Sequence, residues 1–263
     1  MILKEKFENG ADIVSTWLSV GHPVVAEVMA AQGFDFVLID TEHTAITLET
    51  LENMSRGVDA TAGKTETIVR VPSDDPVRIK RVLDIGVAGV MIPMIETAPE
   101  AREVVKAAQY PPEGIRGVAS GRATEYGDEF KEYVETANET IITIVQIESK
   151  RGIENAEEIA NVDGIDAIFI GPADLSANLS VFAEWENDQL NEAIQWVINA
   201  SDSADTPVGT LVVDPTDIEM RVQQGFDYLI IGKDTSQLAS AGEAIQRQYQ
   251  NITDRIDVSS STD

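Results

Sequence analysis

Short apolar runs alternate with amphipathic helical patterns along almost the whole chain, and this alternation is the strongest constraint on its fold. Eight runs have the length and the polar boundaries of strands: 12–18, 34–39, 67–71, 88–92, 141–147, 165–170, 207–213 and 228–231. Strands that alternate with helices form parallel βαβ units, and eight such units are typical of a (β/α)8 TIM barrel. The alternative is a doubly wound open α/β sheet, which the same pattern allows if a strand is miscounted.

The stretch 143–176 brings polar residues to the ends of two of these strands. Gln146 and Glu148 stand at the end of one strand, and a Gly-Pro-Ala turn at 171–173 followed by Asp174 comes directly after the next. Parallel strands present their carboxyl ends at one edge of a sheet, so these side chains should face one site. Two carboxylates with open water positions suit a hard divalent cation. The glycine lets backbone N–H groups approach a ligand oxygen.

The other strands also end in residues that can carry chemistry: Trp17, Asp40, Glu42, His43, Arg70, Asp214 and Asp234. His43 stands beside two carboxylates, and an imidazole with a pKa near 6.5 can act as a base near neutrality. Arg70 lies in an otherwise apolar strand, where a guanidinium needs a partner. It is either half of a structural ion pair or a fixed cation for a carboxylate or enolate oxygen.

Composition limits the partners and the compartment. The 263 residues include 46 acidic and 19 basic side chains, for a net charge of −27, and there is no cysteine. A surface this acidic repels nucleic acid and anionic membranes, and it is also typical of proteins from a high-salt cytoplasm, where screening is short-ranged. Disulfide and thiolate chemistry are excluded. The N-terminus has no apolar signal core and no run is long enough to span a membrane, which predicts a soluble, cytoplasmic protein.

The chain is expected to form one domain. Residues 110–127 are rich in Gly and Pro and break the strand–helix alternation, as functional loops do. The Ser, Thr and Asp residues of 257–263 predict a disordered acidic tail. The expected organisation is therefore a single barrel domain over residues 1–256 and a tail over 257–263.

Several motifs together resemble one family. They are GFDFVLIDTEH (33–43), VRVP (69–72), VLDIGVAGVMIPMIETAPEA (82–101), YPPEGIRGVAS (110–120), VQIES (145–149), GPADLSANL (171–179) and GKDTSQL (232–238). The chain resembles the class II, metal-dependent pyruvate aldolases of the 4-hydroxy-2-oxoheptanedioate and 2-dehydro-3-deoxyglucarate aldolase family, within the citrate-lyase-like superfamily. The resemblance implies a β/α barrel whose last helix is exchanged between subunits, in a homohexamer built as a trimer of dimers.

The resemblance also implies roles for individual residues. Glu148 and Asp174 match metal ligands for Mg²⁺, Mn²⁺ or Co²⁺. Positions that contact the pyruvate part match Gln146, Asp174 and the backbone N–H of Ala173. His43 matches the general base, Arg70 the residue that stabilises the enolate, and Asp84 an acid that raises the basicity of the histidine. Trp17 and Val212 are expected to be walls of the aldehyde pocket, Val212 from a neighbouring subunit.

The implied reaction is reversible cleavage of a 4-hydroxy-2-oxo acid to pyruvate and an aldehyde through a metal-stabilised enolate. Two alternatives stay open on the sequence. One is a citrate-lyase-like lyase for acyl-CoA esters, which would need a basic surface for the CoA phosphates that this acidic chain lacks. The other is a non-catalytic barrel that binds an oxo acid. The residues after Leu179 depart from the family pattern, so we expect them to influence the choice of substrate.

Overall fold

The computed structural model describes residues 2–260, with side chains to residue 256. Eight parallel strands pair in sequence order and β8 pairs with β1, which closes the barrel. The strands are β1 Ile13–Leu18, β2 Phe36–Asp40, β3 Glu66–Arg70, β4 Gly89–Ile92, β5 Ile142–Ile147, β6 Ala167–Ile170, β7 Val208–Val212 and β8 Tyr228–Lys233. The predicted TIM barrel is confirmed, and the open sheet is excluded because the β8–β1 pairing leaves no sheet edge.

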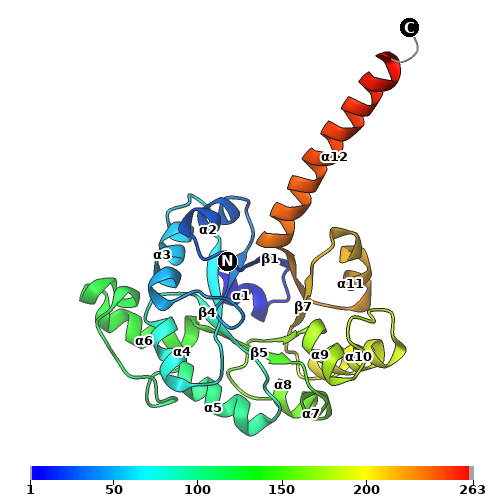
Figure 1. Cartoon of the computed structure of the whole chain (residues 1–263). Helices are drawn as coiled ribbons and strands as arrows, with labels where there is room; N and C mark the ends of the chain where they lie inside the picture. The colour runs from blue at the N-terminus through cyan, green and yellow to red at the C-terminus, as the bar shows by residue number, and fades with distance from the viewer. Residues whose placement is uncertain (1, 261–263) are drawn as a thin grey trace.

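Helices surround the barrel between the strands (Figure 1). They are α1 Leu3–Glu8, α2 Pro23–Ala30, α3 Leu48–Asp59, α4 Pro76–Leu83, α5 Ala98–Ala108, α6 Phe130–Thr140, α7 Lys150–Glu154, α8 Ala156–Ala160, α9 Pro172–Asn178, α10 Asp188–Ser203, α11 Ile218–Gln224 and α12 Asp234–Ser260, with 3₁₀ turns η1 Arg122–Gly127 and η2 Pro215–Asp217. The short helices α1 and α9 were not predicted. The Gly- and Pro-rich loop 110–127 contains η1, which the sequence pattern did not reveal.

The strands sort their side chains into two apolar layers. In β2, Phe36 and Leu38 belong to the cluster that fills the barrel, whereas Val37 and Ile39 belong to the cluster between the strands and the helices. This is the period-two alternation of a pleated strand that is buried on both faces. Phe7 of α1 meets Tyr228 of β8 edge-on at 5.2 Å between ring centroids, so α1 closes the N-terminal end of the barrel. The candidate site described below lies at the opposite, C-terminal end of the barrel.

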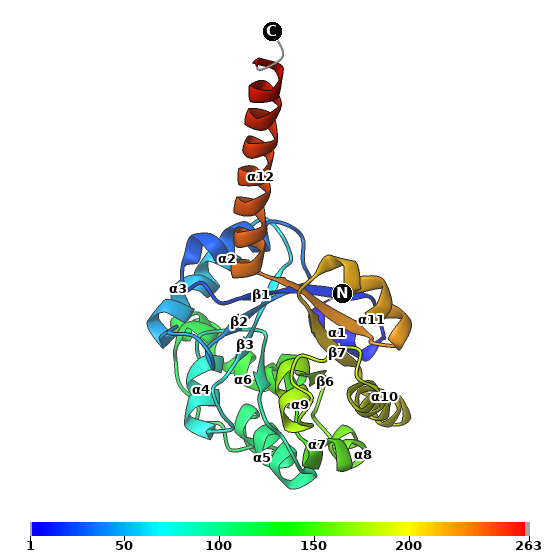
Figure 2. The same ribbon diagram turned by 45° about the vertical axis from the view of Figure 1, so that its right-hand side comes forward.

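The last helix, α12, leaves the barrel instead of covering it (Figures 1 and 2). It exposes large apolar side chains along its length: Leu238, Ile245, Tyr249, Ile252 and Ile256. The helix continues through residues 257–260, the first part of the segment expected to be a disordered tail, and residues 261–263 lie outside the described residues. An isolated amphipathic helix gains little stability without packing.

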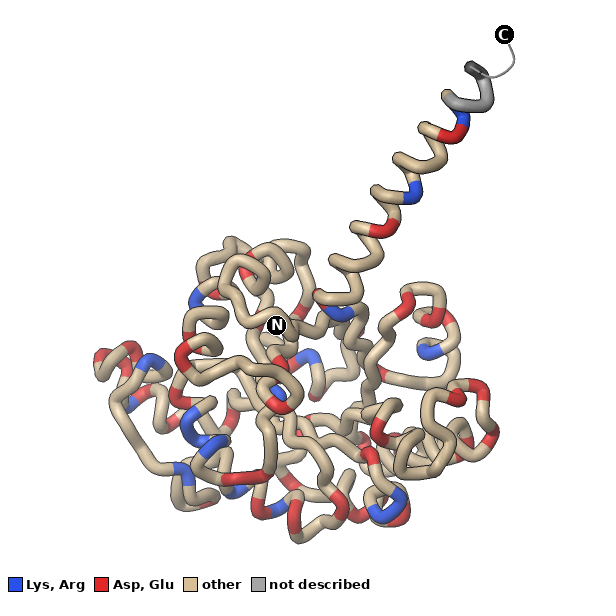
Figure 3. Tube along the Cα trace, viewed as in Figure 1, with Lys and Arg blue, Asp and Glu red and all other residues tan. Residues whose placement is uncertain are grey.

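Acidic side chains are distributed around the barrel, and few basic ones lie between them (Figure 3). Among residues 2–260, no helix is both long and apolar enough to cross a membrane.

Candidate active site

An ion cluster lies at the C-terminal ends of β2 and β3. The Arg70 guanidinium contacts Asp40 through two bonds, Nε to Oδ1 at 3.0 Å and Nη2 to Oδ2 at 2.7 Å, and its Nη1 lies 2.9 Å from Oε2 of Glu42. Burial of Asp40 opposes its ionisation, but the hydrogen bonds and charge of Arg70 outweigh this and hold the Asp40 pKa below its ordinary value. The structural ion pair considered for Arg70 therefore exists.

Arg70 has further features that suit a role in binding. Its guanidinium carbon lies 4.5 Å from the ring centroid of Trp17, which limits its movement through a cation–π contact. The two bonds to Asp40 engage two of the five guanidinium N–H groups. One N–H on Nη2 and both on Nη1 remain, and Oε2 of Glu42, 2.9 Å from Nη1, has no hydrogen-bond partner. Arg70 is thus a fixed cation that can still donate to a bound anion.

Glu148 is the buried carboxylate of the site. It is 2% exposed, its Oε1 accepts the backbone N–H of Met94 at 2.9 Å, and its Oε2 accepts Nε2 of Gln146 at 3.2 Å. Burial, with the nearby charges of Asp174 and Glu42, raises the pKa of Glu148 to about 7. A buried carboxylate is difficult to ionise when it has no partner. Its ionised form becomes favourable when a bound cation neutralises the negative charge.

The donor set around Glu148 fits a divalent cation. Oε1 of Gln146 is buried and has no hydrogen-bond partner, so it is a free oxygen donor beside Glu148. Asp174 lies in the first turn of α9, exposed at the rim. The side chains described here contain no group of three or more His, Cys, Asp or Glu residues arranged around one metal position. Two carboxylates would therefore leave the other coordination positions to water or substrate.

Gly171 makes this arrangement possible. A methyl group on its Cα would lie 2.3 Å from Oε2 of Glu148 and 3.3 Å from Nε2 of Gln146. The turn into α9 therefore passes so close to the carboxylate that any larger residue would force the Glu148 side chain to move. The absence of a side chain at this turn thus leaves room for the carboxylate of Glu148.

His43 lies at the edge of the same site. Its backbone N–H reaches Oδ1 of Asp40 at 3.4 Å, and its Nε2 lies 3.8 Å from Oε2 of Glu42. The side chain is 65% exposed, so it points to solvent at the mouth of the barrel. A histidine in this position can exchange protons with a bound molecule and with water.

Two predicted residues, Asp84 and Val212, lie outside the ion cluster and the carboxylate site described above. Asp84 ends α4 at the N-terminal end of the barrel, where its Oδ1 accepts Nη2 of the buried Arg116 at 3.0 Å. Val212 packs in the outer apolar layer between strands and helices, whereas its neighbour Leu211 packs against the cluster inside the barrel. Val212 also lines a cavity with Ala173, next to the predicted pyruvate site, so only Asp84 would need a neighbouring chain to contact a catalytic site.

Sequence reasoning missed two supporting residues. Met94 has a left-handed φ of 55°, which directs its N–H to Glu148; Pro93 marks the strand end, but nothing in the sequence indicates this backbone angle. Asp234 was noted only as a strand-end acid. Its Oδ2 accepts the N–H groups of Ser19 and Val20 at 2.9 and 2.8 Å, and so fixes the turn that follows Trp17.

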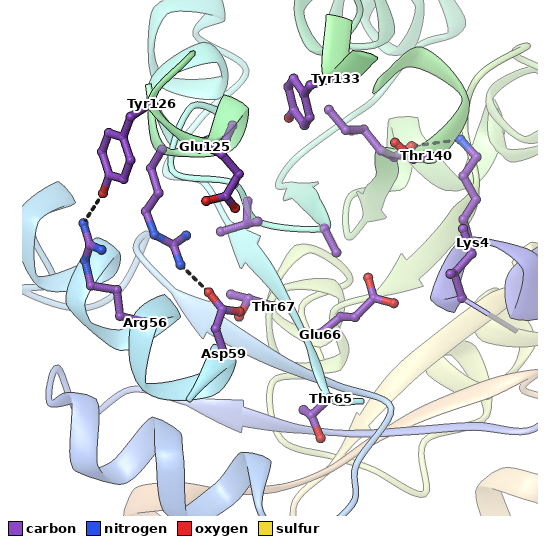
Figure 4. A pocket seen from close by; sticks show the side chains of 17 residues that line it. Lys4, Arg56, Asp59, Thr65, Glu66, Thr67, Glu125, Tyr126, Tyr133 and Thr140 are labelled. Atoms are coloured by element: carbon purple, nitrogen blue, oxygen red, sulfur yellow. Dashed lines mark hydrogen bonds and ion pairs between the residues drawn. The ribbon is translucent and has the colours of Figure 1, made fainter. Parts of the chain in front are cut away.

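A cavity of about 640 Å³ lies at the N-terminal end of the barrel, away from the residues described above, and is shown in Figure 4. Its cations already have partners, since Arg122 pairs with Asp59 and Arg56 donates to the hydroxyl of Tyr126 at 2.9 Å. It contains none of the strand-end residues described above. We therefore assign the chemistry to the C-terminal end, where TIM-barrel active sites lie.

Comparison with known proteins shows the family of the chain. The model of the HpcH/HpaI aldolase/citrate lyase family matches residues 14–241, and the chain belongs to this family. It is 38% identical over 249 residues to a hydroxypyruvate/pyruvate aldolase of Delftia acidovorans, covering 94% of this chain and 91% of that protein. It is 34% identical over 248 residues to a 4-hydroxy-2-oxo-heptane-1,7-dioate aldolase of Shigella sonnei, covering 94% of each. An HpcH/HpaI family structure from Burkholderia cenocepacia J2315 superposes with a TM-score of 0.92 at 32% identity, covering 94% and 98% of the two chains.

Proposed function

We propose that this protein is a carbon–carbon lyase that cleaves a 4-hydroxy-2-oxo acid to pyruvate and an aldehyde, reversibly and with a divalent cation. The observation that carries the proposal is the proximity of a buried, hard-to-ionise Glu148 and a fixed, partly available Arg70. The carboxylate of Glu148 suits a cation, and the guanidinium of Arg70 suits an anion. Pyruvate, with its carboxylate and keto oxygens, has the chemistry to interact with both.

The cation would be held by Glu148 and Asp174. When bound, it supplies Lewis-acid polarisation of the keto group. Gln146 and the backbone N–H of Ala173, at the start of α9, would orient the pyruvate part. The oxygen donors of this site are compatible with each of the three expected ions, Mg²⁺, Mn²⁺ and Co²⁺.

Arg70 would donate its remaining N–H groups to the oxygen on which negative charge develops as the C3–C4 bond breaks. Because Asp40 and Trp17 fix the guanidinium, little reorganisation is needed during the reaction. His43 would accept the proton of the C4 hydroxyl as the aldehyde forms, and return it in the reverse direction. Its exposure gives the proton a route to solvent.

We also propose that the active unit is an oligomer in which α12 packs on a neighbouring chain, as in the expected homohexamer. Exposed apolar side chains flank the part of the barrel that α12 leaves uncovered: Val14 on β1, Val24 and Val28 on α2, and Met220 and Val222 on α11. The exposed side chains of α12 are apolar as well, so the two surfaces suit packing against each other. Such an assembly would also allow Asp84 to approach a site, because it pairs with Arg116 at the N-terminal end of its own barrel.

The direct experiment is pyruvate release from a panel of 4-hydroxy-2-oxo acids, with and without added Mg²⁺, Mn²⁺ or Co²⁺. We expect activity that chelation abolishes and one of these ions restores. Glu148→Gln should lose both cation binding and activity while it keeps the fold, because neutralising one of two carboxylates removes much of the charge that holds the ion. Activity that survives exhaustive chelation would overturn the proposed mechanism.

A further inference from the structure

The turn that follows β4, residues 93–97, lies against the end of β5, the strand that leads into the candidate cation site. The backbone N–H of Met94 donates to Oε1 of Glu148, 54 positions away, at 2.9 Å. The next N–H, that of Ile95, donates to the backbone carbonyl of Gln146 at 3.1 Å. Two consecutive N–H groups of one turn therefore hold both the Glu148 side chain and the strand end beside it.

Glu96 fixes the same turn to the helices on either side of it. Its Oε1 accepts the hydroxyl of Ser149 at 2.7 Å, and its backbone carbonyl accepts Nδ2 of Asn155 at 2.8 Å. Its own N–H donates to Oε2 of Glu100, in the first turn of α5, at 2.9 Å. These bonds fix the chain directly after Met94, while β4 fixes it directly before.

Met94 has a backbone conformation that its side chain does not favour. Its φ is 55°, in the left-handed region, where Cβ crowds the backbone of an L-residue. Packing of the side chain does not explain this conformation, since Met94 is 46% exposed. Pro93 has no N–H group, so Met94 provides the first backbone donor after β4, and its left-handed φ directs that donor to Glu148. Strained residues of this kind persist where the surroundings over-determine them, often at functional sites.

We propose that Met94 is a positioning residue, whose left-handed backbone orients the Glu148 carboxylate for the cation before the cation binds. The inference rests on the proposed function, in which Glu148 is a ligand of the ion. With Met94 N–H on Oε1 and Nε2 of Gln146 on Oε2, each carboxylate oxygen has one donor, which limits rotation of the group. Groups that orient a metal ligand in this way contribute to the affinity for the metal.

The experiment separates the backbone of residue 94 from its side chain. Met94→Val keeps an apolar side chain but places a β-branched residue where left-handed φ is an outlier. Met94→Gly removes the side chain but accepts this φ without strain. In calorimetric titration with Mn²⁺ we expect Met94→Val to bind on the order of 10-fold more weakly, the lower end of the usual effect of losing a group that orients a metal ligand. Met94→Gly should bind Mn²⁺ as the wild type does.

The matched control is Asp205→Val. Asp205 also has a left-handed φ, of 54°, but it lies in the turn between α10 and β7, at the N-terminal end of the barrel. The substitution therefore introduces the same backbone conflict away from the site. It should lower the unfolding temperature and leave the affinity for Mn²⁺ unchanged. In the cation-free protein, amide hydrogen exchange of the segment 93–97 should be faster in Met94→Val than in the wild type or Met94→Gly.

Thermal unfolding of each cation-free variant checks the fold. Wild-type affinity in a folded Met94→Val would overturn the inference and leave the aldolase proposal in place. A clear loss of affinity in Met94→Gly would do the same, because it would show that the side chain is what matters, and this result decides even if Met94→Val does not fold. A wild type that binds neither Mn²⁺ nor Mg²⁺ would instead overturn the cation of the proposed function, and this inference with it.

Discussion

A methyl group added at Gly171 should weaken cation binding without disturbing the fold. The added carbon would lie 2.3 Å from Oε2 of Glu148, whereas ordinary van der Waals contact begins at 3.4 Å, so the carboxylate must retreat by 3.4 − 2.3 = 1.1 Å. The backbone itself can accept alanine, because φ at Gly171 is −83°, within the range of any residue. The substitution is therefore a steric displacement of one predicted ligand.

The expected loss in cation affinity follows from that displacement. Disturbing the support of a metal ligand typically costs about 10- to 100-fold in affinity, or about 1.4 to 2.7 kcal/mol at 1.36 kcal/mol per tenfold change. Misplacement by roughly 1 Å can cost a similar factor in turnover. Gly171→Ala should thus bind Mg²⁺ or Mn²⁺ about 10- to 100-fold more weakly, and activity should fall further at limiting cation.

Calorimetric titration with Mn²⁺ measures the affinity directly, and thermal unfolding of the cation-free chain checks the fold. The matched control is Gly63→Ala, where the nearest atom to the added carbon is 3.6 Å away and far from the site. It should bind the cation as the wild type does. Wild-type affinity in a folded Gly171→Ala would refute the assignment of Glu148 as a ligand held in place by this turn.

Three further predictions concern charge. Arg70→Ala should lose about 10²-fold in turnover and stop solvent-proton exchange at the pyruvate methyl group, since both need the stabilised enolate; near-normal exchange by NMR would assign Arg70 to structure alone. In the cation-free chain the Glu148 pKa is raised from 4.5 to about 7, so the folded state retains a proton that the unfolded state releases. The free energy of unfolding should therefore fall as pH rises across that interval, while the affinity for Mg²⁺ rises. If both quantities depend on pH in the same way in Glu148→Gln, their pH dependence does not come from Glu148. With a net charge of −27, the assembly should need roughly molar salt, and an active hexamer of equal heat stability at about 0.1 M and 2 M KCl in sedimentation and activity assays would refute the salt adaptation.

The sequence by itself determined the barrel, because two signals repeat along it. Apolar runs such as residues 34–39 are too short for helices and apolar on both faces, which only a strand covered on both sides explains. Polar residues such as Glu148 and Asp174 follow these runs directly, and parallel strands leave them no other place than one rim. The strands and the rim residues could therefore be predicted without coordinates.

Short local features were harder to predict. The helices α1 and α9, with 6 and 7 residues, have too few turns to show a helical period. The left-handed backbone at Met94 is imposed by its surroundings, because a residue with a side chain has no intrinsic preference for it.

The pairing of charges, in contrast, depends on the folded chain as a whole. In sequence, Arg70, Arg116 and Arg221 are three arginines among apolar neighbours. In the folded chain, Asp40 reaches Arg70 from 30 positions away and Asp84 reaches Arg116 from 32 positions away. Among the described side chains, no carboxylate forms an ion pair with Arg221, whose hydrogen-bond partner is Gln224. Asp84 likewise proved remote from the site of its own chain. Ion pairs across such separations depend on the packing of whole elements, which local sequence does not encode.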